Sequence, residues 1–187
     1  MLILETPRVR LRNWREEDRD LFRLINSDPE VMEFFPKRRS PEESDALFAV
    51  VIDRIDRTGF GFYCIADRDS DQPLGFCGLA HADLDEQFGE DAIEVGWRLA
   101  RPYWGKGLVT EAGKALLAYG FEERGLEEIV SFAVKGNTRS RAVMERIGLR
   151  HAPHRDFDHP RIPDDMPHLK PHVTYALDRA GFEQMRA

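Results

Sequence analysis

Hydrophobic and polar residues alternate along several short stretches of the chain, a period of two that is typical of half-buried strands. The alternation is clear over residues 8–14 (RVRLRNW) and strongest over residues 92–100 (AIEVGWRLA). Two apolar runs, FGFYCIA and LGFCGLAHA, flank the polar segment DRDSDQP and predict a hairpin or meander. We expect two further strands, at residues 128–134 (EIVSFAV) and 172–178 (HVTYALD).

Apolar residues three or four positions apart predict helices between these strands. The first helix covers residues 16–26. The stretch SDPEVMEFF (27–35) predicts a second, short helix, with Asp28 as its cap and Pro29 at its first position. The letters SPEE at 40–43 form a capping box, in which a serine and a glutamate satisfy each other's backbone N–H groups, and this predicts the start of a third helix.

The second half of the chain alternates strands and helices. After the strand at 92–100 we expect a helix from Gly107 to near Gly125, and after the strand at 128–134 a helix over 137–148. The order strand–helix–strand–helix predicts that these two strands pair in parallel. No repeat, low-complexity tract or long linker divides the sequence, so we expect a single domain over residues 1–187.

The composition narrows the range of partners. With 27 basic and 34 acidic residues the chain carries a formal net charge of −7, so we expect no nucleic-acid binding and a better match to a cationic substrate. Cys64 and Cys77 are too few for a disulfide framework or a four-ligand zinc site, and we interpret them as buried thiols of a reducing compartment. The start MLILETP lacks the basic residues and the long apolar run of a signal peptide or membrane span. These features predict a cytoplasmic protein without membrane contact.

One short motif points to an anionic ligand. Gly105, Lys106 and Gly107 stand directly before a predicted helix, where unpaired backbone N–H groups and the helix dipole favour phosphate. The motif is not a nucleotide-binding P-loop, because Lys106 is followed by glycine instead of serine or threonine. It is not a dinucleotide fingerprint either, because Thr110 occupies the place of the third glycine.

The segments EVGWRLARPYWGKGLVTEA (94–112) and NTRSRAVMERIGL (137–149) resemble the GNAT superfamily of N-acetyltransferases. Together with ETPRVRLRNWREEDRDLFRLINSDPEVMEFFP at the N-terminus they resemble its RimJ/RimL-like branch, the ribosomal-protein N-terminal acetyltransferases. The resemblance implies an α+β fold, with a mixed, mostly antiparallel twisted sheet flanked by helices. It also implies that acetyl-CoA, as cosubstrate, lies between two parallel strands that splay apart.

The resemblance also implies which residues bind acetyl-CoA. Backbone amides hold the pyrophosphate at Gly105, Lys106, Gly107, Leu108 and Val109. The end of a strand, Trp97, Arg98 and Leu99, pairs with the pantetheine arm, and Asn137 sits beside that arm. Each also has a simpler interpretation, since Asn137 suits a helix cap, Lys106 a solvated loop and Trp97 the core. Two positions depart from the superfamily pattern, because Pro102 replaces the usual Gln or Arg and Met144 replaces the tyrosine that often serves as general acid.

Acetyl transfer to an amine requires a group that removes the ammonium proton and a source of protons for the leaving thiolate. Glu94 is the candidate base, because it alternates against Ile93 and Val95 and so points to the opposite face of the sheet; the alternative is a surface or salt-bridged glutamate. Ser140, one turn after Asn137, is the candidate acid for the sulfur, and the alternative is a hydrogen bond to its own helix. Neither cysteine lies in the motif region, so we expect direct attack in a ternary complex.

Three more residues are candidates for the acceptor side: Glu33, Asp158 and His159, whose acidic or polar groups would attract an amine. Five of the six histidines lie in the C-terminal part, but Lys170 and Pro171 separate His168 from His172, and we expect no metal site. The sequence therefore predicts an acetyl-CoA-dependent N-acetyltransferase that acts on a primary amine, either a protein N-terminus or a small molecule. A CoA-binding sensor or scaffold without turnover and a histidine metalloenzyme are the alternatives, and an exposed strand edge would allow a homodimer.

Overall fold

The computed structural model describes residues 1–186, whose nine strands form one mixed sheet in the order β1-β2-β3-β4-β5-β6-β9-β7, with β8 beside β9. Neighbouring strands are antiparallel throughout, except for the parallel pair β5 and β6. The strands are β1 (Leu2–Glu5), β2 (Val9–Arg12), β3 (Gly61–Asp67), β4 (Pro73–His81), β5 (Ile93–Leu99), β6 (Glu128–Val134), β7 (Arg150–His151), β8 (Phe157–Asp158) and β9 (Pro171–Asp178). This arrangement confirms the predicted mixed, mostly antiparallel sheet.

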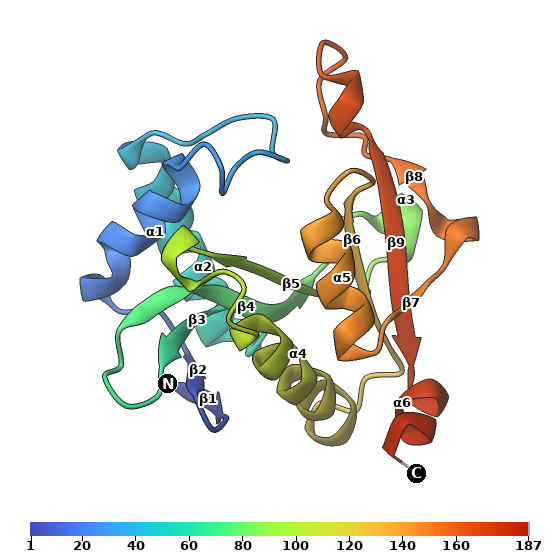
Figure 1. Ribbon diagram of the computed structural model, residues 1–187, viewed down its shortest axis with the longest axis horizontal. Helices are drawn as coiled ribbons and strands as arrows, with labels where there is room; N and C mark the ends of the chain where they lie inside the picture. The colour runs from blue at the N-terminus through green and yellow to red at the C-terminus, as the bar shows by residue number, and fades with distance from the viewer. Residues whose placement is uncertain (187) are drawn as a thin grey trace.

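Six α-helices accompany the sheet in the described part of the chain (Figure 1). They are α1 (Arg19–Ser27), α2 (Pro41–Thr58), α3 (Asp85–Phe88), α4 (Leu108–Ala118), α5 (Thr138–Ile147) and α6 (Arg179–Arg186). The predicted capping box is present, because Ser40 Oγ accepts from the N–H of Glu43 and the Glu43 carboxylate accepts from the N–H of Ser40. Within residues 1–186, none of the helices has the length and apolar character that crossing a membrane requires.

The two faces of β5 meet different helices. Val95 pairs with Leu79 of β4, and Leu79 approaches Gly120 just beyond α4, so the Val95 face lies toward α4. The opposite face carries Glu94, Gly96 and Arg98, and Arg98 reaches Asn26 of α1. The Glu94 face, called the acceptor face below, therefore lies toward α1.

Strands β5 and β6 separate soon after they meet. Their only parallel register pair in the described chain is Glu94 with Val130. Each strand keeps its other neighbour, since β5 pairs with β4 from Ile93 to Leu99 and β6 pairs with β9 along its whole length. In residues 1–186 the β6-facing backbone edge of β5 beyond Glu94 is therefore left without a strand partner, and this confirms the predicted splayed pair.

The segment 28–39, called the strap below, crosses from α1 toward β6 and α5 (Figure 1). The predicted helix over 27–35 is wrong, because Ser27 ends α1 and residues 29–34 form turns. Asp28 does cap, since its carboxylate accepts from the N–H groups of Glu30 and Val31. Side-chain contacts with distant elements then set the path: Phe34 packs against the small apolar cluster of Val134, Ile162 and Leu169.

A buried ion pair holds the start of α1 against the sheet. The guanidinium of Arg12 in β2 donates to both carboxylate oxygens of Asp18, at 2.6 and 3.0 Å, and both side chains are almost fully buried. Asp71 from the β3–β4 turn contacts the same guanidinium at 3.0 Å. This anchor fixes the direction in which α1 leads to Asn26 and the strap.

Arg12→Met should lower the free energy of unfolding by about 3 kcal/mol, because it leaves the Asp18 carboxylate buried without its partner. Urea unfolding measures the loss. Arg57→Met is the matched control, because Arg57 and Asp53 form an exposed pair whose removal should cost less than about 1 kcal/mol. Equal losses in the two variants would contradict the anchoring role.

Candidate active site

The loop before α4 presents a row of free hydrogen-bond donors. Gly105 and Gly107 adopt φ of +72° and +74°, a backbone conformation that strains other residues. Within residues 1–186, none of the six N–H groups from Gly105 to Thr110 donates a hydrogen bond, and the helical pattern begins with the N–H of Glu111 on the carbonyl of Gly107. Such a row at a helix start suits a phosphate.

Arg8, directly before β2, holds this loop in place, and the sequence analysis did not identify it. Its Nη1 donates to the carbonyl of Lys106 at 2.9 Å, and its Nε donates to the Glu111 carboxylate in the first turn of α4 at 2.6 Å. Glu111 also accepts from the hydroxyl of Thr6 at 2.6 Å. Turning the Lys106 carbonyl toward Arg8 helps to hold the loop in the conformation that exposes its N–H groups.

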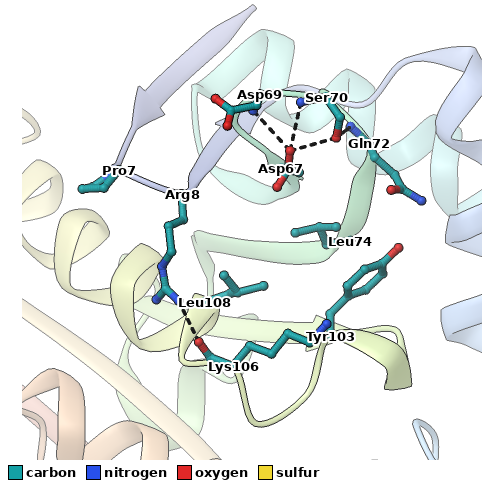
Figure 2. Close-up of a pocket in the computed structure, with 10 residues that line it drawn as sticks. All are labelled: Pro7, Arg8, Asp67, Asp69, Ser70, Gln72, Leu74, Tyr103, Lys106 and Leu108. Atoms are coloured by element: carbon teal, nitrogen blue, oxygen red, sulfur yellow. Dashed lines mark hydrogen bonds between the residues drawn. The ribbon is translucent and has the colours of Figure 1, made fainter.

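A surface pocket of about 370 Å³ lies beside the loop (Figure 2). Arg8, Lys106 and Tyr103 line one part of it, and Asp67 at the end of β3 and residues of the turn that follows line another. The ammonium of Lys106 lies 5.6 Å from the centre of the Tyr103 ring. None of the lining residues belongs to β5, β6 or α5, so this pocket is separate from the place where the two strands diverge.

The three residues predicted to meet the pantetheine arm point their side chains to different faces. Leu99 is buried in the core, and Trp97 packs against the same core. Arg98 points to the acceptor face. What the three residues share is the backbone edge of the strand, and a strand-like pairing with the arm uses backbone groups. One of these groups is already engaged, because the carbonyl of Leu99 accepts from the Trp104 indole at 2.8 Å.

The start of α5 lies beside the loop. The Arg139 guanidinium lies over the Trp104 ring, 4.5 Å from its centre. Asn137 caps α5, since its side-chain oxygen accepts from the N–H of Ser140 at 3.1 Å. The Ser140 side chain is half-buried, and its hydroxyl makes no hydrogen bond to the rest of residues 1–186. The alternative role for Ser140, a hydrogen bond within its own helix, is therefore absent from the described structure.

Glu94 occupies the last position at which β5 and β6 still pair. Its side chain keeps limited contact with solvent, but no salt bridge to it occurs within residues 1–186. Burial, with a smaller contribution from the negative charge of Asp83, raises the pKa of Glu94 to about 8. The carboxyl is thus mostly protonated at neutral pH, and when ionised it is a stronger base than an ordinary glutamate.

His159 and Asp158 come from the second half of the sheet. The His159 ring lies 4.8 Å from the His172 ring and next to Phe132 of β6. Burial and the neighbouring His172 lower the pKa of His159 to about 4, so the ring is neutral at physiological pH. Asp158 pairs with Pro171 at the exposed edge strand β8.

The histidine cluster shares a side of the sheet with Glu94. Tyr175 of β9 contacts Glu145 of α5, so the residues that alternate with it, His172 among them, face away from α5. The Arg161 guanidinium donates to the carbonyl of Asp83, the residue whose charge acts on Glu94. These contacts place His159 on the same side as Glu94.

Glu33 is not free to meet a ligand in this conformation. Its carboxylate pairs with Arg139 at 2.6 Å, and both side chains are about half exposed. The ion pair fastens the strap to the first turn of α5. Glu33 therefore lies at the α5 end of the site, away from Glu94, which neighbours Asp83.

Cys64 and Cys77 are buried free thiols, and burial raises their pKa values, for Cys77 to about 12. They stay protonated at neutral pH and are poor nucleophiles. In the part of the chain that the structure describes, no three His, Cys, Asp or Glu side chains lie close enough together to hold a metal ion.

Known proteins resemble the chain over most of its length. A sequence profile described as the acetyltransferase (GNAT) domain matches residues 8–150. The uncharacterized protein YkkB of Bacillus subtilis is 30% identical over 152 residues, which cover 80% of this chain and 86% of YkkB.

Solved structures share the fold. A GNAT-family acetyltransferase from Bacillus anthracis matches with a TM-score of 0.78 and 25% identity, covering 95% of this chain and 98% of that one. RimL, a ribosomal L7/L12 alpha-N-protein acetyltransferase in complex with coenzyme A, matches with a TM-score of 0.75, covering 95% and 98% of the two chains, but at 15% identity it shows the fold alone. The RimJ/RimL-like branch stays a prediction. Because the profile spans more than half of the sequence, the chain belongs to the GNAT acetyltransferase family, and it is an N-acetyltransferase that uses acetyl-CoA.

Proposed function

We propose that the protein transfers the acetyl group of acetyl-CoA directly to a primary amine within a ternary complex. The observation that carries the proposal is the row of six free N–H groups at Gly105–Thr110, beside the unpaired edge of β5. The row would hold the pyrophosphate, and the edge of Trp97–Leu99 would pair with the pantetheine arm. The acetyl group would then lie near Glu94, where the two strands meet.

Two side chains supply the proton transfers in this proposal. An amine arrives mostly as ammonium, because its pKa is near 8 for an α-amino group and near 10 for an alkylamine. Glu94 accepts that proton directly or through one water. The Ser140 hydroxyl, beside the arm on α5, donates to the departing sulfur. Asp158 and His159 would line the acceptor side, and Glu33 would contribute only when the strap releases Arg139.

The acceptor is either a protein N-terminus, as in the RimJ/RimL-like branch, or a small-molecule amine. A free-thiol release assay with a panel of amines and peptides tests the proposal, because each transfer liberates one CoA thiol. We expect release that depends on the amine. Tight binding of acetyl-CoA with no release by any amine would contradict catalysis and favour a CoA sensor.

Gly107→Asp should weaken CoA binding by about 100-fold or more, through bulk and negative charge at the place proposed for the pyrophosphate. Its added Cβ would meet Arg8 only at 3.6 Å, so the fold should persist. Gly125→Asp is the matched control, because Gly125 has φ of +68° and open space around it. Calorimetry that finds wild-type affinity in the folded Gly107 variant would overturn the loop assignment.

With an alkylamine acceptor, whose own pKa is near 10, Glu94→Gln should lower kcat/KM by about 100-fold at pH 8 and remove an inflection near pH 8 from the pH profile, because glutamine cannot accept the proton. The wild-type profile should rise through that pKa as Glu94 ionises. A constant ratio between the two profiles at every pH would show that Glu94 only positions the acceptor.

The same variant has a stability readout. The folded-state pKa of Glu94 lies above its ordinary value of about 4.3, so the wild type loses stability as the pH rises from that value through about 8. Glu94→Gln should therefore melt several degrees higher than the wild type at pH 9 and show no such advantage near pH 4.

Ser140→Ala should lower kcat by about 10-fold and leave CoA affinity unchanged, because a proton for the departing sulfur matters only near the transition state. Steady-state kinetics and calorimetry separate the two quantities. An unchanged kcat would reduce Ser140 to a packing residue.

A further inference from the structure

Arg98 is a cation on the acceptor face that has no anionic partner within residues 1–186. Its Nη1 donates to the side-chain oxygen of Asn26 at 2.6 Å. Its guanidinium carbon lies 4.2 Å from the centre of the Phe35 ring and 5.2 Å from that of Phe76. Its Nε is buried and has no hydrogen-bond partner within residues 1–186. The guanidinium is thus held in position with part of its donor capacity unused.

A second arginine, Arg39, lies close by and forms no salt bridge within residues 1–186. Its charge acts on Glu43, but the Glu43 carboxylate pairs with Lys37 at 2.7 Å. The N–H of Arg39, at the end of the strap, donates to the carbonyl of Asn26 at 2.8 Å. In the described chain no carboxylate forms a salt bridge with Arg39 or Arg98, and the nearby Asp28 is engaged by Arg101. Burial, and to a smaller extent the charge of Arg39, lowers the pKa of Arg98 to about 9.

A buried arginine with a second positive charge nearby and no salt-bridged anion is unfavourable, since the burial of Arg98 and the repulsion from Arg39 add together. A carboxylate placed between them would form charge-assisted hydrogen bonds with both and offset the repulsion. The rings of Phe35 and Phe76 already fix the orientation of Arg98, so little side-chain entropy would be lost on binding. The arrangement has the features of an anion site.

We propose that Arg98 and Arg39 bind a carboxylate of the acceptor, so that the acceptor is an amine with an anionic group at its other end. The inference rests on the proposed function of Glu94. Arg98 and Glu94 share one face of β5 and are four residues apart, which is roughly 13 Å along a strand. An acceptor that reaches both residues therefore carries its amine and its carboxylate at opposite ends of a spacer.

Matched substrate pairs test this inference. We expect ω-amino carboxylates of increasing length to exceed alkylamines of the same length by about 10–100-fold in kcat/KM, with an optimum at one length. Peptides that carry either glutamate or glutamine near the N-terminus extend the comparison, and show whether the carboxylate comes from a peptide or a small molecule. Equal kcat/KM values within all pairs would overturn the inference, while acetyl transfer itself would still stand.

Charge removal locates the effect. Arg39→Gln should abolish the preference for the carboxylate and leave kcat/KM for the matched alkylamine within about 3-fold. Arg98→Gln should also abolish the preference, which is measured as the ratio of the two kcat/KM values within each substrate pair. Arg38→Gln is the control, because Arg38 is exposed and its substitution removes the same charge at the neighbouring position. Arg98→Gln also removes the hydrogen bond to Asn26 of α1. Two further variants therefore keep the test independent of folding: Arg39→Gln, and Arg98→Lys, which keeps the charge and should retain part of the preference.

A measurement without turnover separates this inference from the proposed function. Adipate, a dicarboxylate without an amine, should bind the wild type and Arg38→Gln in calorimetry and lose about 10-fold or more in affinity in Arg39→Gln. Binding that is absent from the wild type, or equal in all variants, would overturn the anion site. Adipate binding that depends on Arg39, in a protein that acetylates no amine, would instead contradict the proposed function alone.

Discussion

The separation of β5 from β6 is the constraint on which the rest of the site depends. One register pair, Glu94 with Val130, joins the two strands, while each strand remains paired on its other side. A parallel connection needs a crossover helix, and α4 supplies it, so the loop before α4 lies at the open end of the pair. The same separation gives β5 a free backbone edge, and brings the starts of α4 and α5 together across it.

Desolvation acts on two groups of the same strand face with opposite results. Burial without a compensating charge favours the neutral form of any ionisable group. It therefore raises the pKa of Glu94 and lowers that of Arg98. A glutamate with a raised pKa suits the proposed acceptor, because the ammonium group must lose a proton. An arginine without a salt-bridged counter-ion suits an acceptor that carries a carboxylate. In the proposed complex the ligand supplies both missing charges, an ammonium for Glu94 and a carboxylate for Arg98.

Local patterns predicted much of the fold but not the strap. The strand at residues 128–134 and the helix capped by Asn137 follow from periodicity and capping chemistry, which neighbouring residues determine. The prediction failed at residues 27–35, where Asp28 and Pro29 resemble a helix start. There Phe34 and Glu33 bind elements about 100 residues further along the chain, and these contacts outweigh local helix propensity.

The candidate site was predictable only where a motif marks it. The loop Gly105–Gly107 could be predicted because its two glycines favour the positive φ angles that it adopts. The brace from Arg8, the charge of Asp83 beside Glu94 and the proximity of Arg39 to Arg98 depend on residues that are distant in sequence. The sequence does not distinguish Arg98 from the other arginines, because the lack of a salt bridge depends on which side chains surround it in the folded protein.

The most direct test of the central claim is a titration of the ¹⁵N-labelled protein with CoA, followed by amide NMR. The account predicts that the largest shifts, and new protection from hydrogen exchange, fall on the N–H groups of Gly105–Thr110, which have no acceptor within residues 1–186, and on the edge of β5. Shifts centred instead on Asp67 and the turn after β3, or none at millimolar CoA, would contradict it.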